Sequence, residues 1–305
     1  MKYIYGPVPS RRLGISLGIS PIPKKTCNYS CVYCQLGRTD HLTNKREMFF
    51  KVEDIMGEFD EILKRDFKFD VITIVGEGEP MLYLGLGDLI SEVKKRTEKP
   101  VAVITNGSLF YDFDVKSALS NADIVLPSID AYDELSFKKI NRPHGMLKFN
   151  DIFNGLKTFS ENYKGQIWLE MMLIKNINDD DISLKKYYEL FKQIKYDRLY
   201  LNTPIRPPAE SNVEAIDHET MNHAIQILGG TSIDLLHSSG FHSEIKDHYI
   251  AIISIIKRHP MNQFEIESFL KSRDCGNISE IINQLKQDDK IDIINYKGYD
   301  TYRLK

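Results

Sequence analysis

Three cysteines lie close together near the start of the chain, at Cys27, Cys31 and Cys34. Their spacing, C-x3-C-x2-C, lets one short loop present three thiolates to one face of a metal cluster. A four-iron cluster normally takes four cysteine ligands, so three would leave one iron open to a cofactor or a substrate. The only other cysteine, Cys275, has no cysteine near it in sequence, and we expect it to be a small buried residue.

Two other interpretations of these cysteines are open. A structural zinc site needs a fourth ligand, and His41 lies seven residues beyond Cys34. The cysteines could instead be unrelated buried residues, but the residues between them are mostly polar and lysines precede them. The short spacing therefore favours an iron–sulfur cluster.

Polar residues follow or interrupt the apolar, strand-like runs of the sequence, at 71–75, 101–105, 124–129, 167–174 and 199–202. Glycine in the run GEGEP at 76–80 permits close backbone approach to a ligand, and a carboxylate accepts hydrogen bonds from an ammonium group. Glu170 lies inside an otherwise apolar strand and needs a partner, either a ligand or a structural ion pair. The candidate binding residues are Gly78, Glu79, Pro80, Thr105, Asn106, Ser128, Asp130, Glu170 and Asn202.

Together these motifs resemble the radical S-adenosylmethionine (radical SAM) superfamily. The resemblance rests on the cysteine spacing, on Tyr33 just before the last cysteine, and on residues 76–80, which match a Gly-Gly-Glu-Pro motif except at Glu77. It implies that SAM binds the open iron through its methionine amine and carboxylate. One electron then cleaves the sulfonium to give a 5′-deoxyadenosyl radical that abstracts hydrogen. It also implies that Tyr33 and the candidate residues above contact SAM.

Within the superfamily, the opening GPVPSRRLG at 6–14 resembles a subgroup of bacterial and archaeal proteins that is grouped with wyosine-base (tRNA) synthases. The segments NRP at 141–143 and NTPIRPPAE at 202–210 fit the same resemblance. Wyosine-base synthases carry a second cluster on additional N-terminal cysteines. This chain has none, so we do not expect the wyosine reaction.

The elements that must position these residues alternate along the chain. A first strand is expected near 13–20, and helix-period segments lie near 51–65, 84–96, 114–121, 149–163 and 181–194. Continuous apolar strands alternating with helices indicate parallel pairing, here in about six βα units. The fold class is therefore α/β, a partial (β/α)6 barrel of the radical SAM type or an open sheet, with its chemistry at the carboxyl ends of the strands.

The pattern changes after residue 230. We expect a barrel domain at 1–230, a linker at 231–247 and a small winged-helix-like module of three helices and a hairpin at 248–305. The third helix has one cation, Lys286, against Glu280, Asp288 and Asp289, so DNA binding is not expected, and docking of a substrate or partner, or a structural lid, is favoured. The histidines match no common metal spacing and are taken as linker residues: His237, His242 and His248.

Charge is unevenly distributed. Residues 1–46 hold eight basic side chains and one acid, Asp40, although the whole chain has a net charge of −3. This basic segment could form a positive rim around the cysteines that attracts an anionic substrate such as RNA, or it could simply balance an acidic neighbour. On the substrate side, Arg142 and Arg206 are candidates for anion contacts, with His144 and Glu210, against the alternative of solvated turn residues.

A composition of 42% hydrophobic and 27% charged residues is typical of a globular protein and argues against disordered and collagen-like classes. Without an apolar signal core or membrane span, we expect a cytoplasmic protein with no membrane partner. We expect a radical SAM enzyme with one [4Fe-4S] cluster, reduced by flavodoxin or ferredoxin and acting on RNA or protein. The alternative is a non-catalytic iron–sulfur regulatory or scaffold protein with a winged helix.

Overall fold

Most of the chain before residue 233 surrounds one eight-stranded sheet, as the computed structural model shows for its described residues, 2–65, 68–233, 241, 243, 245–257, 259–296 and 298–305. The first two strands are antiparallel, and from the second strand onward each strand is parallel to the next along the sheet. In spatial order the strands are β1 (Ile4–Ser10), β2 (Gly14–Ile19), β5 (Val71–Ile74), β6 (Val101–Thr105), β7 (Ile124–Pro127), β8 (Gln166–Met172), β9 (Arg198–Asn202) and β10 (Thr231–Ser232).

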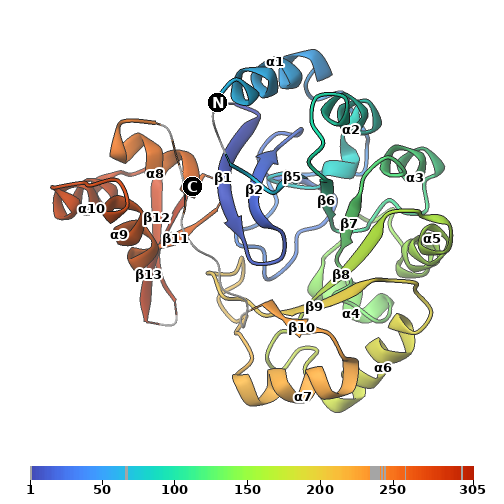
Figure 1. Cartoon of the computed structure of the whole chain (residues 1–305). Coiled ribbons are helices and arrows are strands. Elements are labelled where there is room, and N and C mark those ends of the chain that lie inside the picture. The colour runs from blue at the N-terminus through green and yellow to red at the C-terminus, as the bar shows by residue number, and fades with distance from the viewer. Residues whose placement is uncertain are drawn as a thin grey trace.

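Helices connect the parallel strands and lie in an arc along the outer side of the sheet (Figure 1). They are α1 (Val52–Leu63), α2 (Leu86–Lys94), α3 (Phe113–Leu119), α4 (Glu134–Ile140), α5 (Phe149–Asn162), α6 (Asp181–Phe191) and α7 (His218–Leu228). The prediction of an α/β fold with a mostly parallel sheet is confirmed. None of the described helices is long and apolar enough to cross a membrane.

Both faces of the sheet are buried, which explains why its strands are apolar throughout. All four residues of β5 are buried, and Ile72 and Ile74 belong to the large core that the sheet forms with the helices. A second, smaller cluster on the other face includes Val71, Leu126 and Trp168. Helix α1 is amphipathic, as predicted, and its buried residues include Ile55 and Phe59.

The structure adds elements that the sequence pattern does not predict. Strand β1 contains Pro7 and Pro9, which suggest a loop, but β1 lies at the edge of the sheet, where proline is tolerated. Helices α4 and α7 are also additional; α4 is only seven residues long, so it carries little periodic signal. Strand β10 pairs with β9 and lies just beyond the expected domain boundary at residue 230.

The C-terminal unit, residues 248–305, has its own hydrophobic core. Its elements are α8 (His248–Ile256), β11 (Met261–Asn262), α9 (Gln263–Lys271), α10 (Ile278–Gln287), β12 (Ile291–Tyr296) and β13 (Tyr299–Leu304). The strands form a separate antiparallel sheet in the order β11-β13-β12. The three helices and the hairpin are thus present as predicted. His248 begins α8, whereas His237 and His242 lie outside the described residues.

This unit lies beside β1, at the edge where the helix arc is open (Figure 1). Lys24 Nζ donates to the carbonyl oxygens of Leu304 and Lys305 at 3.2 and 2.9 Å. Tyr296 donates its hydroxyl to the carbonyl of Pro204 at 2.7 Å. The end of the chain is therefore bound to the sheet-containing part, close to the cysteine loop.

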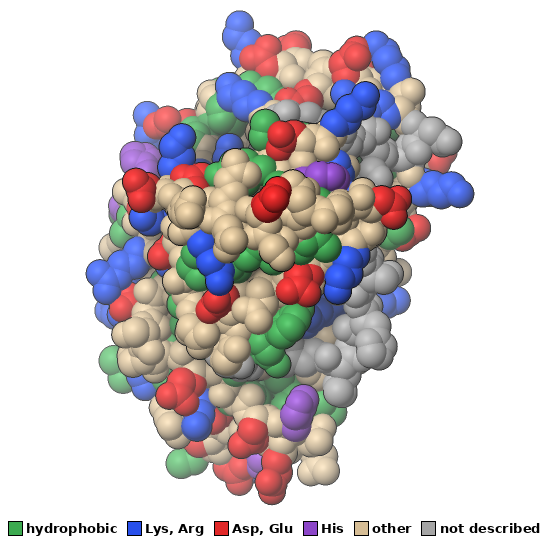
Figure 2. All heavy atoms as spheres, turned by 90° about the vertical axis from the view of Figure 1, so that its left-hand side faces the viewer, with side chains coloured by type: hydrophobic (Ala, Val, Ile, Leu, Met, Phe, Trp, Pro, Cys, Tyr) green, Lys and Arg blue, Asp and Glu red, His purple; other side chains and the backbone are tan. Residues whose placement is uncertain are grey.

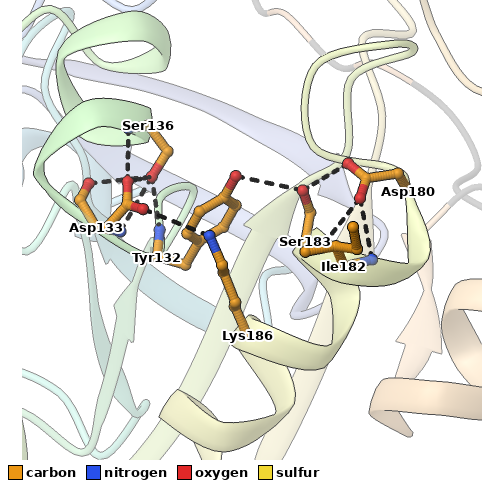
Figure 3. A network of polar contacts seen from close by, with 7 residues as sticks. All are labelled: Tyr132, Asp133, Ser136, Asp180, Ile182, Ser183 and Lys186. Carbon is orange, nitrogen blue, oxygen red and sulfur yellow. Dashed lines mark hydrogen bonds and ion pairs between the residues drawn. The ribbon is translucent and has the colours of Figure 1, made fainter.

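The segment that follows β7 is held by a polar network between the first turns of α4 and α6 (Figure 3). Asp133 and Ser136 form a capping box on α4, and Asp180 caps α6. The two caps are joined through Tyr132, whose hydroxyl lies 3.3 Å from the Ser183 Oγ, and through Lys186, whose Nζ lies 4.3 Å from the centre of the Tyr132 ring. This network fixes the backbone immediately after Asp130.

Removing a large side chain from the core should destabilise the sheet-containing part. Phe59 is fully buried, so Phe59→Ala should lower the free energy of unfolding by about 3–5 kcal/mol, measured by anaerobic guanidinium unfolding under reducing conditions. The fluorescence of Trp168, the only tryptophan, reports this part of the chain. Phe113 is 78% exposed, so Phe113→Ala is the control and should change stability by no more than about 0.5 kcal/mol. Equal losses of unfolding free energy in the two variants would contradict the assignment of Phe59 to the core.

Candidate functional site

The three clustered cysteines lie in the long connection between β2 and α1. Cys27 ends the short strand β3 (Thr26–Cys27), which pairs in parallel with β4 (His41–Leu42). Beyond it the chain turns tightly, because the Cys34 amide donates to the Cys31 carbonyl at 3.1 Å. All three thiols are free, and the cysteine residues as a whole are half-buried. The loop thus holds three sulfurs just beyond the carboxyl end of β2.

Side-chain amides approach two of these sulfurs. Asn106 Nδ2 lies 3.6 Å from Cys27 Sγ and Asn141 Nδ2 lies 3.5 Å from Cys31 Sγ. The backbone amide of Tyr29 also donates to Cys27 Sγ at 3.4 Å. The sulfurs of Cys27 and Cys31 are therefore hydrogen-bond acceptors in a prepared polar environment.

Burial raises the pKa of all three thiols above the ordinary value. The charge of Glu79 raises the pKa of Cys27 further, whereas Lys25 and Arg303 oppose the rise for Cys34. Buried thiols of high pKa are poor nucleophiles at neutral pH, since the thiolate is the reactive form. A bound metal centre would displace their protons.

The donor set suits a cluster better than a single ion. Among the described residues, which include Cys27, Cys31, Cys34 and His41, no three His, Cys, Asp or Glu side chains are placed to hold one metal ion. A tetrahedral zinc site needs its ligands around one point, at about 2.0–2.3 Å. In a four-iron cluster each thiolate binds a different iron, so the sulfurs need not converge, and the all-sulfur set matches the usual ligands.

The GEGEP segment at 76–80 lies directly against the cysteine loop. A Cβ atom at Gly78 would overlap the carbonyl oxygen of Thr26, so only glycine fits there. Glu79 is buried, and its carboxylate accepts from the Thr105 hydroxyl at 2.6 Å and from the backbone amides of Asn106 and Met81 at 2.7 and 2.8 Å. Burial raises the pKa of Glu79 to about 7, although these hydrogen bonds oppose the rise. In this structure Glu79 therefore ties β6 to the cysteine loop.

Asp130 plays a similar part on the other side of the loop. Its carboxylate accepts from the Tyr33 hydroxyl, from Asn141 Nδ2 at 3.1 Å and from the Met172 amide at 2.9 Å. Burial raises the pKa of Asp130, and these donors oppose the rise. Through this contact Tyr33, which precedes Cys34, is attached to the segment that follows β7.

A cavity of about 430 Å³ begins at the cysteine loop and extends along the inner face of the sheet. Among the predicted residues it is lined by Tyr33, Cys34, Ser128, Glu170, Asn202 and Arg206. A smaller space of about 30 Å³ is lined by Asn106, Ser128 and Asp130. The remaining predicted SAM residues, Gly78, Glu79, Pro80 and Thr105, support the cysteine loop and do not line the larger cavity.

Glu170 has a structural partner, as a half-buried carboxylate in an otherwise apolar strand requires. The guanidinium of Arg12, in the turn between β1 and β2, forms an ion pair with the Glu170 carboxylate inside the cavity, and Asn202 Nδ2 donates to Glu170 at 3.2 Å. Burial lowers the pKa of Arg12 to about 10. Arg12 was not predicted as a site residue, and its only signal in the sequence is its place in the GPVPSRR motif.

Arg206 joins the barrel loops to the C-terminal unit. Its guanidinium binds the Glu265 carboxylate at 3.2 Å and lies 2.7 Å from His259 Nε2, and all three residues line the cavity. Burial, followed by the charges of Arg206 and Arg11, holds the pKa of His259 well below its ordinary value, so the imidazole is neutral at pH 7. Because His259 Nε2 accepts from Arg206, its proton is on Nδ1.

Arg142 is placed elsewhere. Together with Arg38 it binds the carboxylate of Glu210, at 2.5 and 2.8 Å, and these two arginines lower the pKa of Glu210 to about 2. The Glu210 amide donates to the Val32 carbonyl at 3.0 Å, so this cluster clamps the outside of the cysteine loop. His144 lies in a turn, where its amide donates to the Asn28 carbonyl at 2.8 Å. Neither Arg142 nor His144 lines the cavity.

Comparison with known proteins shows which family this chain is similar to. Residues 22–187 match the family model of the radical SAM superfamily. The UPF0026 protein MJ1312 of Methanocaldococcus jannaschii is 36% identical over 310 residues, which cover 98% of this chain and 94% of the relative. A UPF0026 protein of Helicobacter pylori is 33% identical over 285 residues, 92% of each chain.

Among solved structures, TYW1 with a bound lysine-pyruvate adduct superposes with a TM-score of 0.52, covering 70% of this chain and 72% of that chain. The two sequences are 19% identical, so this similarity concerns the fold alone.

The Arg206–Glu265 pair should hold the C-terminal unit against the cavity. Glu265→Gln keeps an acceptor for the capping box of α9 but removes the charge that pairs with Arg206. We expect docking to weaken by about 1–3 kcal/mol, because a partly buried arginine loses its charged partner. Hydrogen–deuterium exchange should become faster at 203–206 and in β12. Glu267→Gln on the same helix, where Glu267 pairs with exposed Lys271, is the control; equal effects of the two variants on exchange would contradict the assigned junction.

Proposed function

Because the chain belongs to the radical SAM superfamily, we propose that it is an enzyme that binds one [4Fe-4S] cluster through Cys27, Cys31 and Cys34 and cleaves SAM. The single observation that carries the proposal is the position of three free thiols in one loop, whose last cysteine, Cys34, lines a cavity along the carboxyl ends of parallel strands. When bound, the cluster and SAM would supply a one-electron cleavage that yields methionine and a 5′-deoxyadenosyl radical, which takes a hydrogen atom from the substrate.

For SAM we propose contacts with Tyr33, Ser128, Glu170 and Asn202, which line the larger cavity, and with Asn106 and Asp130, which line the smaller space. We propose further contacts with the residues that support the cysteine loop: Gly78, Glu79, Pro80 and Thr105. Their support is their common place at the carboxyl ends of successive strands, where ligands bind in α/β folds. The Arg12–Glu170–Asn202 group offers charged and amide partners inside the cavity. It would orient polar groups of the cofactor and limit the entry of water.

The electron that the reaction needs would come from a low-potential protein, flavodoxin or ferredoxin. The chain has four cysteines, and three are assigned to the one cluster. Cys275 is buried in the core of the C-terminal unit and its thiol donates to Asn277 at 3.2 Å. A second cluster therefore lacks ligands, which supports an external donor.

The C-terminal unit, which we propose to be a winged-helix domain, would form one wall of the substrate site. The order helix, short strand, two helices and hairpin supports this domain type, and His259 and Glu265 bring it to the cavity. Figure 2 shows basic and acidic side chains interspersed on the face of the molecule that carries this unit. Nucleic-acid binding favours clustered cations, so the mixed face supports docking of a substrate rather than of DNA.

For the substrate we favour a protein or peptide over RNA. In the basic N-terminal segment, Arg12, Lys25, Arg38 and Lys45 pair with acids, and Lys24 and Arg46 donate to backbone carbonyls. Lys2 lies over the rings of Tyr3 and Phe50, and Arg11 also has a partner. These contacts reduce the charge left to attract phosphates. RNA remains an outcome that the substrate experiment distinguishes.

Anaerobically reconstituted wild-type protein with dithionite should convert SAM to 5′-deoxyadenosine even without substrate, detected by liquid chromatography and mass spectrometry. Replacing any one of the three clustered cysteines by alanine should reduce the formation of 5′-deoxyadenosine at least 100-fold, because the cluster loses a ligand. Cys275→Ala is the matched control and should keep wild-type iron content. A cluster without SAM cleavage would instead support the non-catalytic alternative, and loss of iron in Cys275→Ala would refute the ligand assignment.

The substrate class can be tested by incubating the reduced protein with SAM and extract fractions from deuterium-grown cells, separated into RNA and protein. Transfer of deuterium into 5′-deoxyadenosine from the protein fraction is expected, since the radical takes its hydrogen from the substrate. Transfer from the RNA fraction alone would contradict the preference stated here.

A further inference from the structure

We infer that Asn106 and Asn141 are positioning residues that raise the reduction potential of the cluster by donating amide hydrogen bonds to two of its three ligand sulfurs. The inference rests on the proposed function, because it takes Cys27 and Cys31 as cluster ligands. It concerns side chains of this chain only. It is tested by a potential rather than by catalytic activity.

Asn106 is held so that its amide nitrogen faces Cys27. Its backbone amide donates to Glu79 at 2.7 Å, and its Oδ1 accepts from the Ser108 amide at 2.9 Å. The side-chain amide therefore has its oxygen already engaged, and its Nδ2 lies 2.9 Å from Asn28 Oδ1 as well as 3.6 Å from Cys27 Sγ. An Nδ2 group has two hydrogens, one for each acceptor.

Asn141 makes the equivalent arrangement at Cys31. It follows α4, its backbone amide donates to the Phe137 carbonyl at 2.9 Å, and its carbonyl accepts from the Ser30 amide at 3.0 Å. Its Nδ2 bridges Asp130 Oδ2 at 3.1 Å and Cys31 Sγ at 3.5 Å. The side chain is buried, so water does not compete for these contacts.

Cys34 has a different environment. Within the part of the chain that the structure describes, no side-chain amide donates to the sulfur of Cys34. This cysteine lines the cavity, and the positive charges of Lys25 and Arg303 favour its thiolate. The two asparagines are therefore specific to Cys27 and Cys31. They come from separate places in the fold, the end of β6 and the end of α4, which makes two independent tests possible.

The physical effect follows from charge. One-electron reduction, with the electron taken from flavodoxin, ferredoxin or dithionite, adds negative charge to the cluster and its sulfurs. A hydrogen bond to sulfur stabilises the more negative state more strongly, and such bonds are among the factors that set iron–sulfur potentials. Loss of either amide should make reduction harder.

The test is a redox titration of the anaerobically reconstituted full-length protein, followed by electron paramagnetic resonance of the reduced cluster. The variants are Asn141→Leu, which is close in shape, and Asn106→Ala. We expect about a tenfold lower equilibrium constant for reduction in each, a midpoint about 59 mV more negative, with iron content unchanged. Asn44→Ala is the control, since its amide contacts Tyr111 and Asn28 and not a sulfur; its midpoint should equal that of the wild type.

The outcomes separate this inference from the proposed function. Wild-type protein that assembles no cluster would refute the proposed function itself. A normal cluster with unchanged midpoints in both variants would overturn the inference alone. If one variant fails to assemble a cluster, the other decides, because it acts on a different sulfur. Folded variants that both fail to bind iron would assign the asparagines to assembly and overturn the tuning role.

Discussion

Two buried carboxylates, Glu79 and Asp130, hold the cysteine loop in place, and the rest of the site depends on them. Each satisfies its charge with hydrogen bonds from several elements rather than with a cation. Each also holds one asparagine, Asn106 or Asn141, whose amide then reaches a cysteine sulfur. Burying a carboxylate costs free energy unless it is fully hydrogen-bonded. Several contacts therefore fix the position of each of these two side chains.

The C-terminal unit lies at the edge of the sheet beside β1, where the arc of helices is open (Figure 1). An open sheet leaves its inner face accessible, and here the C-terminal unit covers part of that opening through Arg206, His259 and Glu265. The cavity is thus lined by residues more than 250 positions apart in sequence, from Tyr5 to Glu265. Such a wall would help to exclude water from the proposed reaction, and it belongs to a part of the chain with its own hydrophobic core.

Charge is used mainly within the molecule. The basic N-terminal segment contains the cations that pair with Glu170, Glu210 and the chain's own C-terminal carbonyls. These contacts connect the first strands and the cysteine loop to parts of the chain that are distant in sequence. The excess of cations in residues 1–46 therefore helps to assemble the site, because the remaining chain supplies acidic partners for several of them.

The sequence by itself determined the local features: the cysteine spacing, the alternation of buried strands with amphipathic helices, and the helices and hairpin of the C-terminal unit. These depend on periodicity and short motifs, which neighbouring residues specify. It did not reveal β1, whose prolines suggest a loop, or Arg12 as the partner of Glu170. Only the tertiary structure decided that Glu79 binds Thr105 and that Asp130 binds Tyr33 rather than lining the larger cavity, and that Arg206 meets Glu265. Those pairings join residues far apart in the chain, and their partners are chosen by strand order and burial, which no local pattern records.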